Sequence, residues 1–206
     1  IVPIADPERE IPSNRFNDGK CDPAGRLWAG TMAFDATPDA GALYCLDTNR
    51  SVIEKIAPVT ISNGIVWNSK CDTMYYIDTA TNNVRAYDYV LDSGAITNER
   101  IVVINNEGGG FDGMAIDSDD NLWIAVFHGG GVRCYNPESG LMIRELSLPV
   151  TNVTSCAFGG NDLDELYVTC AREGLSENDL AKQPLAGSLF RLNPGVQGTP
   201  SYSYAG

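Results

Sequence analysis

Positive charge is scarce in this sequence, and so is histidine. The 206 residues contain 14 Lys and Arg against 27 Asp and Glu, a formal net charge of −13, with a single histidine. Nucleic acids and anionic membranes are bound by clustered Lys and Arg, so we expect neither as a partner. One histidine excludes a His–His pair, and the lack of a G-x-S-x-G motif argues against a serine hydrolase triad.

Long apolar runs and closely spaced cysteines are also missing. No apolar stretch approaches the roughly 18 residues that a membrane-spanning helix requires. The six cysteines are dispersed without a C-x-x-C pair, which excludes simple zinc-ribbon and thioredoxin-like motifs. Most of them lie in apolar, strand-like stretches, which indicates reduced thiols. We therefore expect a cytoplasmic protein, with the nucleus as a second location.

Signals for long helices, EF-hand loops and P-loops are absent as well. The sequence has 21 glycines and 11 prolines, which together with its aromatic residues predict many short strands and turns. The one capping-box pattern runs from Ser176 to Asp179 and predicts only a short turn within a loop.

What the sequence does have is a repeat of about 45 residues. Aliphatic–aromatic pairs recur at intervals of 47, 48 and 44 residues, at Leu27-Trp28, Met74-Tyr75, Leu122-Trp123 and Leu166-Tyr167. Each period provides a short buried strand, an aromatic strand, a third strand and a variable outer segment. Four-stranded units at this period indicate an all-β fold, a β-propeller, forming one domain over residues 1–206. A β-sandwich is the alternative, but its turn signals do not repeat as whole blocks.

Asn and Asp residues stand at the starts of the expected first strands. The strand starts are Asn17-Asp18, Asn63, Asp112 and Ser155, and glycine follows directly in the first three. Such pairs form ordinary turns, but three in register favour a site where first strands line the central channel. Amide and carboxylate oxygens without cysteine or paired histidine suit a hard cation such as Ca²⁺ or Mg²⁺.

The loops that follow the second strands reach the same mouth of the channel. They carry polar residues that could contact a substrate, namely Asp35, Asp78, Thr79, His128 and Arg172. Arg15 approaches the same mouth, and its guanidinium offers a rigid fork of hydrogen-bond donors.

Several segments together resemble a known family. They are RFNDGKCDPAGRLWAGTM from Arg15, ISNGIVW from Ile61, MYYIDT from Met74, FDGMAID from Phe111, SCAFGG from Ser155, ELYVTCAREGL from Glu165 and the final SYSYAG. This combination resembles the regucalcin (senescence marker protein)/gluconolactonase family, which also includes luciferin-regenerating enzymes, and the regucalcin branch fits best. The resemblance implies a six-bladed propeller and a metal-dependent hydrolase that opens a small-molecule sugar lactone such as gluconolactone.

The resemblance also implies roles for individual residues. One divalent metal ion (Ca, Zn, Mn or Mg) would be held by Asn63 and Asp112 and by a Glu from the first blade. Arg15 and Asn17 would contact the substrate, and Asp35 would bind sugar hydroxyls. Asp112 would also be the catalytic proton acceptor.

The length departs from this family pattern. At about 45 residues per blade, the chain provides four to five blades, so we expect an N-terminal blade with its metal-binding Glu upstream of Ile1. Whether the chain alone is active stays open. Three other functions also remain: a non-catalytic calcium-binding regulator of the regucalcin type, a hydrolase of other lactones or esters, and a scaffold propeller that binds proteins.

Overall fold

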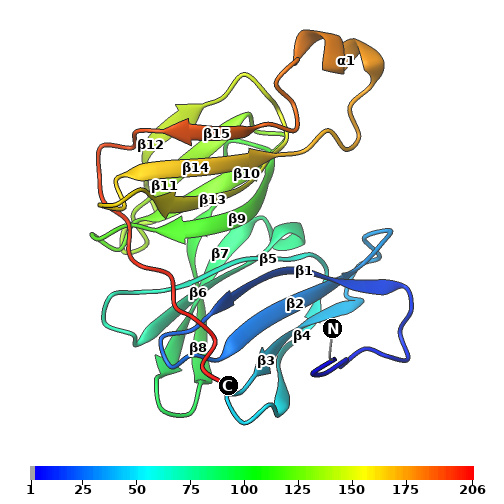
Figure 1. The fold of residues 1–206 in the computed structure, drawn as a ribbon, viewed down its shortest axis with the longest axis vertical. Coiled ribbons are helices and arrows are strands. Elements are labelled where there is room, and N and C mark those ends of the chain that lie inside the picture. Colours follow the sequence, from blue (N-terminus) through cyan, green and yellow to red (C-terminus); the bar gives the residue numbers. More distant parts are fainter. Residues whose placement is uncertain (1–2) are drawn as a thin grey trace.

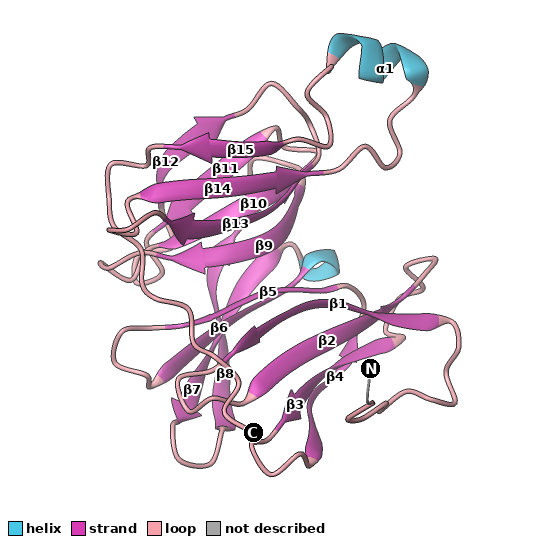
Figure 2. Ribbon diagram, viewed as in Figure 1, coloured by secondary structure: helices cyan, strands magenta, loops and turns pink. Residues whose placement is uncertain are grey.

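Residues 3–206 are described by a computed structural model, in which the strands form four antiparallel sheets arranged as blades of a β-propeller (Figures 1 and 2). The first sheet contains β1 (Asn14–Cys21), β2 (Leu27–Ala33), β3 (Gly41–Leu46) and β4 (Val52–Val59). The second contains β5 (Ser62–Trp67), β6 (Thr73–Asp78), β7 (Asn83–Val90) and β8 (Ala95–Ile104). The third contains β9 (Gly110–Ile116), β10 (Leu122–Phe127), β11 (Gly131–Tyr135) and β12 (Met142–Ser147). The fourth contains β13 (Val153–Gly159), β14 (Glu165–Cys170) and β15 (Leu189–Leu192).

The strand order within each sheet confirms the order expected from the repeat. Strands follow one another as neighbours in every sheet, and the aromatic residue of each repeat lies on the second strand. In the described part of the chain the fourth sheet has three strands, so the repeat predicts one outer strand too many there.

A short helix interrupts the fourth blade. The chain leaves β14 and forms α1 (Glu177–Lys182), which projects from the blade in Figure 1, before it returns as β15. The Ser176 side chain accepts a hydrogen bond from the Asp179 amide, and the Asp179 side chain accepts one from the Ser176 amide. The capping box therefore starts a helix of six residues where the sequence predicted only a turn. No helix among residues 3–206 is both long and apolar enough to cross a membrane.

A buried aspartate ties the first turn to the second strand in two blades. The Trp28 indole donates to Asp22 Oδ2 at 2.9 Å, and the Trp123 indole donates to Asp117 Oδ2 at the same distance. Each carboxylate also accepts backbone amides of its own turn. The aromatic residue that marks the repeat is thus held in place by the turn that precedes it.

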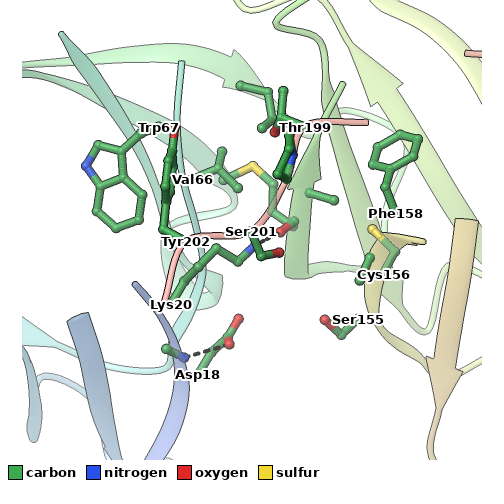
Figure 3. A pocket seen from close by; sticks show the side chains of 16 residues that line it. Asp18, Lys20, Val66, Trp67, Ser155, Cys156, Phe158, Thr199, Ser201 and Tyr202 are labelled. Carbon is green, nitrogen blue, oxygen red and sulfur yellow. Dashed lines mark hydrogen bonds between the residues drawn. The ribbon is translucent and has the colours of Figure 1, made fainter. Parts of the chain in front are cut away.

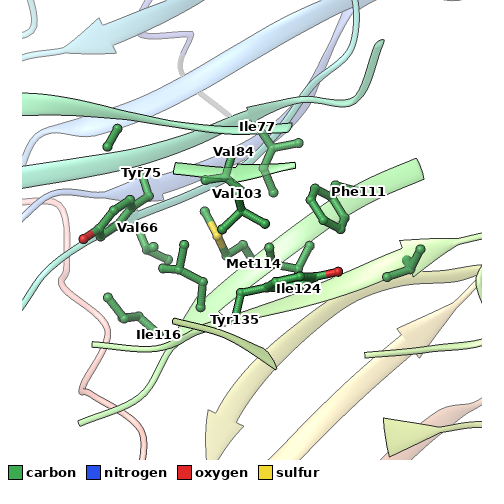
Figure 4. Close-up of a cluster of buried hydrophobic side chains, with 13 residues drawn as sticks. Val66, Tyr75, Ile77, Val84, Val103, Phe111, Met114, Ile116, Ile124 and Tyr135 are labelled. Atoms are coloured by element: carbon green, nitrogen blue, oxygen red, sulfur yellow. The ribbon is translucent and has the colours of Figure 1, made fainter. Parts of the chain in front are cut away.

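The hydrophobic core lies between neighbouring blades. One cluster joins the second and third sheets and includes Tyr75, Val84, Phe111, Ile124 and Tyr135 (Figure 4). Similar clusters fill the other two gaps, with Trp28 and Trp67 in one and Trp123 and Val168 in the other. Burial of these side chains fixes the angle between blades and thereby the position of the central strands.

The C-terminal segment, residues 197–206, is here called the strap. It crosses the molecule from the fourth blade back to the first (Figure 1). Backbone hydrogen bonds join it to three blades, through Leu163, Ile116, Ser118 and Gly25. The Tyr202 hydroxyl lies 3.8 Å from Cys71 Sγ, and the Tyr204 hydroxyl donates to the Asp47 carbonyl at 2.8 Å. The strap therefore contacts all four blades.

Candidate metal and substrate site

The first strand of every blade is irregular at its start. The register of the pairing with the second strand shifts between Phe16 and Gly19, between Ser62 and Ile65, opposite Asp112, and between Val153 and Ser155. A bulge re-aims side chains relative to the regular alternation of a strand. This explains how consecutive residues of β1, Asn17 and Asp18, both reach the mouth of the channel.

Glycines bring the first strands close together at these bulges. A Cβ at Gly64 would lie 2.5 Å from Met114 Cβ, and a Cβ at Gly113 would lie 2.2 Å from Ser155 Oγ. Only glycine fits such approaches, as the sequence pattern predicted. The polar side chain beside each glycine is therefore held at a narrow channel.

A cavity of about 710 Å³ opens at this mouth. It brings together all five residues predicted for the site, which are Arg15, Asn17, Asp35, Asn63 and Asp112. The residue four positions after each repeat aromatic also lines it, in every blade: Met32, Thr79, Phe127 and Ala171. The mouth is thus built by the same two positions of each repeat, one on the first strand and one after the second.

Directed hydrogen bonds connect three blades across this mouth. Arg15 Nη1 donates to Asn17 Oδ1 at 2.7 Å, and Asn17 Nδ2 donates to Asn63 Oδ1 at 3.1 Å. Asn63 Nδ2 then donates to Thr79 Oγ1 at 2.7 Å, and the Thr79 hydroxyl donates to the Phe111 carbonyl at 2.7 Å. Each group polarises the next, so the chain is stronger than isolated bonds would be.

The two ends of this chain determine the orientation of both amides. The Phe111 carbonyl can only accept, so the single Thr79 hydroxyl proton is used there and Thr79 must accept from Asn63 Nδ2. Asn17 Nδ2 likewise donates to the Ser62 carbonyl at 2.7 Å. Asn63 therefore turns Oδ1 toward Asn17 and keeps one lone pair for a further partner.

Two carboxylates, Asp18 and Asp112, line the mouth cavity, and their negative charges repel each other. Burial, together with the negative charge of Asp18, raises the pKa of Asp112 to about 7, although a hydrogen bond from the Gly113 amide acts to lower it. Burial also raises the pKa of Asp18, against the lowering effects of Lys20 and the Gly19 amide. Both shifts indicate a place where negative charge is concentrated and poorly solvated.

The donors at the mouth fit part of the coordination shell of a divalent cation. Within residues 3–206, no three His, Cys, Asp or Glu side chains form a metal-binding group. What this chain offers is two carboxylates, Asp18 and Asp112, and the amide oxygen of Asn63. These are hard oxygen donors, the kind that Ca²⁺, Mg²⁺ and Mn²⁺ prefer, and they would leave positions for water or another ligand.

Two rim residues, Arg15 and Asp35, are exposed and keep hydrogen-bonding groups for a ligand. Arg15 is exposed and also donates to the Phe16 carbonyl. Asp35 is exposed, and hydrogen bonds from the Thr37 hydroxyl and amide to its Oδ1 lower its pKa, so that Oδ2 remains for another donor. Both side chains are therefore accessible to a ligand in the cavity.

Two of the rim candidates lie elsewhere than expected. Asp78 is buried, because its carboxylate accepts the amides of Thr60, Ile61 and Ala80 and so holds a turn together. Arg172 is not among the residues lining the cavity, whereas Glu173 is. The expectation that Asp78 contacts a substrate is wrong, and in that blade Thr79 faces the mouth instead.

A second, smaller chamber of about 210 Å³ lies behind the mouth. Asp18 and Ser155 line both spaces, and strap residues Thr199 and Tyr202 line the chamber at its other end (Figure 3). Lys20 extends into it and donates to the Met114 carbonyl at 2.8 Å. Burial lowers the pKa of Lys20, although the nearby Asp18 charge opposes this effect.

Sequence reasoning placed Asp18 and Thr79 near the mouth but assigned neither a role in holding the metal. Asp18 follows Asn17, and regular alternation would place it on the opposite face of the strand, but the bulge brings it to the mouth. Thr79 was a rim candidate, yet its bonds to Asn63 and Phe111 join separate blades. The recurrence of the fourth position after each aromatic is the signal that would have singled it out.

The fold and the site define a β-propeller whose channel mouth gathers amide and carboxylate oxygens from successive blades. The family model of the SMP-30/Gluconolactonase/LRE-like region matches residues 1–172. The chain therefore belongs to this family. This membership confirms the family that the sequence motifs indicated.

Relatives resemble the chain over its whole length. Regucalcin from Oryctolagus cuniculus is 44% identical over 213 residues, which cover 100% of this chain and 71% of that protein. The structure of a luciferin-regenerating enzyme has a TM-score of 0.91 at 37% identity and covers 97% of this chain and 68% of that one. A calcium-binding protein, regucalcin from Agrobacterium tumefaciens, has a TM-score of 0.91 at 31% identity, with 98% and 68% covered.

Proposed function

We propose that this protein is a metal-dependent hydrolase that opens sugar lactones, a gluconolactonase-type carboxylic ester hydrolase. The observation that carries the proposal is the convergence of Asn63 and Asp112 with Arg15, Asn17 and Asp35 on one cavity. Membership of the SMP-30/gluconolactonase/LRE-like family supports the reaction class. A relative described as a calcium-binding protein supports a divalent cation as cofactor.

Asp112 is the group that would handle the proton of the attacking water. Its pKa of about 7 describes the chain without metal, and a cation bound beside it would favour the charged form, so that Asp112 would be ionised and able to accept a proton at neutral pH. Asn63 and Asp112, together with Asp18, would hold the cation. When bound, a divalent cation supplies Lewis acidity toward a carbonyl oxygen.

The hydrogen bonds at the mouth restrict how a sugar lactone can bind. Both Nδ2 hydrogens of Asn17 are used by the Ser62 carbonyl and Asn63 Oδ1. Asn17 would therefore accept from a substrate hydroxyl through Oδ1, beside the bond from Arg15. Arg15 would donate from its remaining nitrogens and Asp35 would accept through Oδ2. The rim can therefore bind substrate hydroxyls both as hydrogen-bond acceptors and as donors.

A metal-dependence assay tests this function. The chain is stripped of metal with a chelator, and hydrolysis of glucono-1,5-lactone is measured after addition of Ca²⁺, Mg²⁺, Mn²⁺ or Zn²⁺. We expect turnover with at least one cation and its loss when the chelator is restored. Calcium binding without turnover for any cation would instead favour the alternative of a non-catalytic regulator, which the calcium-binding relative also supports. Turnover of other esters alone would reassign the substrate.

We also place the protein in a reducing compartment such as the cytoplasm, with a small molecule rather than nucleic acid or membrane as its partner. All six cysteines are free thiols, and Cys45, Cys134 and Cys156 are buried as apolar residues. Burial raises the pKa of the Cys45 thiol to about 11, which keeps it protonated and unreactive. Thiol alkylation of the protein from cell extract, with and without reduction, tests this location.

A further inference from the structure

His128 is a residue at the mouth that the proposed mechanism leaves unused. It is the single histidine of the sequence and follows β10 directly. Phe127, the last residue of β10, pairs with Gly110 of β9, two residues before Asp112. His128 is exposed and lines the mouth cavity. It therefore belongs to the same blade as the expected proton acceptor.

The backbone at His128 is in a conformation that favours glycine. Its φ is 60°, in the left-handed region, although three glycines follow it. Backbone hydrogen bonds hold this turn on both sides: the Gly129 amide donates to Val126, the Gly130 amide donates to Thr151, and the Gly130 carbonyl accepts from Leu148. These bonds fix the backbone from which the His128 side chain reaches the mouth cavity.

The imidazole packs against one neighbouring ring and has free hydrogen-bonding groups. Its ring lies edge-on to the Phe127 ring, with centroids 4.4 Å apart. Among residues 3–206, no hydrogen bond uses either of its nitrogens, and Glu173 lines the same cavity. An imidazole whose nitrogens have no partner can form a hydrogen bond with a hydroxyl of a ligand in the cavity.

We propose that His128 binds a ring hydroxyl of the lactone and selects hydroxylated lactones over unsubstituted ones. Arg15 and Asp35 come from the first blade, and His128 comes from the third, so the substrate is held from two sides above Asn63 and Asp112. This inference rests on the proposed lactonase function and adds a specificity-determining contact to it.

Two substrates and two variants test the contact. Glucono-1,5-lactone carries hydroxyls, whereas δ-valerolactone has the same ester ring without them. His128→Gly keeps the left-handed backbone and removes the ring, and His128→Asn keeps the backbone with a smaller polar group. For His128→Gly we expect KM for glucono-1,5-lactone to rise about three- to tenfold, the loss of one hydrogen bond, with kcat within about twofold. Both constants for δ-valerolactone should stay the same, and His128→Asn should recover part of the effect.

A spectroscopic measurement checks the contact without turnover. Because the chain has one histidine, ¹⁵N-histidine labelling gives a single imidazole, whose nitrogen resonances should shift on titration with D-gluconate, the hydrolysis product. Normal turnover with unchanged KM in His128→Gly, or equal KM changes for both lactones, overturns the role of His128 and leaves the lactonase function intact. A wild-type chain that neither turns over a lactone nor binds D-gluconate overturns both.

Discussion

Asp112 combines a cost to stability with a use in chemistry. Its pKa of about 7 lies above the ordinary value of 3.8, because burial and Asp18 disfavour the charged form. The metal-free folded chain therefore holds a proton that the unfolded chain releases. The contribution of protonated Asp112 to the free energy of unfolding is fully present below about pH 4 and is lost as the pH rises toward 7. A cation bound at the mouth would offset this loss, because it would neutralise the negative charges of Asp112 and Asp18.

The first prediction concerns Asp112→Asn. At pH 8 the metal-free variant should be more stable than the wild type by at least about 1 kcal/mol, since one pKa unit corresponds to about 1.4 kcal/mol. The same variant should lose about 10²- to 10⁴-fold in lactone turnover with metal present. Urea unfolding at pH 5 and pH 8 and a lactonase assay measure the two effects. Near-normal turnover would contradict the role of Asp112 as proton acceptor.

Thr79 is predicted to act through Asn63. Thr79→Val keeps the shape but removes the hydroxyl that fixes the Asn63 amide, so Asn63 can turn its Nδ2 toward the mouth. We expect Ca²⁺ or Mn²⁺ affinity to fall about 10-fold or more, as is usual when the residue that orients a ligand is lost. Thr79→Ser, which keeps the hydroxyl, is the matched control. Equal calorimetric affinity in all three proteins would show that Asn63 needs no such orientation.

At the scale of elements, the two turns that hold tryptophans differ in charge. Burial acts to raise the pKa of Asp22, but hydrogen bonds from the Arg26 amide, Trp28, Tyr89 and the Arg26 side chain outweigh it and leave the pKa low. Asp22 forms a buried ion pair with Arg26 at 2.7 Å. In the other blade, Asp117 accepts from Asn121 and Trp123 without a cationic partner in the hydrogen bonds of residues 3–206.

This difference predicts unequal costs for the same substitution. Asp22→Asn leaves the Arg26 guanidinium buried without its counter-charge and should cost about 3–5 kcal/mol. Asp117→Asn weakens hydrogen bonds from neutral donors only, leaves no buried cation without a partner, and should cost about 1–3 kcal/mol. Because the pKa of Asp22 is lowered, its contribution is present above its unfolded pKa and is lost as the pH falls. Urea unfolding at pH 7 and pH 4 measures both; equal costs at pH 7 would contradict the importance of the ion pair.

The elements were largely predictable because the repeat is local. The Trp28 and Trp123 positions determine second strands, and the Asn-Gly and Asp-Gly pairs determine the starts of first strands, each within a few residues. The chain of bonds from Arg15 to Phe111 was not predictable, because it joins side chains of three blades and depends on packing between them. The repeat predicted an outer strand for the fourth blade that the described residues lack, although the strap after β15 carries no alternating pattern and so already argued against a strand there.

At the scale of the whole molecule, the strap is the element that joins distant blades. Its Tyr204 hydroxyl and Ala205 amide bind the first blade, and its Gly198 amide binds the fourth. It also lines the chamber behind the mouth through Thr199 and Tyr202. Loss of the strap should therefore loosen the arrangement of blades and open that chamber.

Two variants test this role. Tyr204→Phe removes one hydroxyl bond to the Asp47 carbonyl and should lower stability by about 1 kcal/mol. Deletion of residues 199–206 should lower it further, and hydrogen exchange should increase at amides around Lys20 and Met114. Unchanged exchange there after the deletion would show that the blades hold their positions without the strap.

The strap also determines the order in which the fold can be completed. The four described blades are synthesised in the order of the sequence, and local strand pairing can proceed as each repeat emerges. The contacts of Tyr204 and Ala205 with Asp47 and Gly25, however, join the strap to the first described blade across at least 157 residues of sequence. Contacts of such large sequence separation form slowly and late. The first of the four described blades therefore stays partly open until the strap has been synthesised.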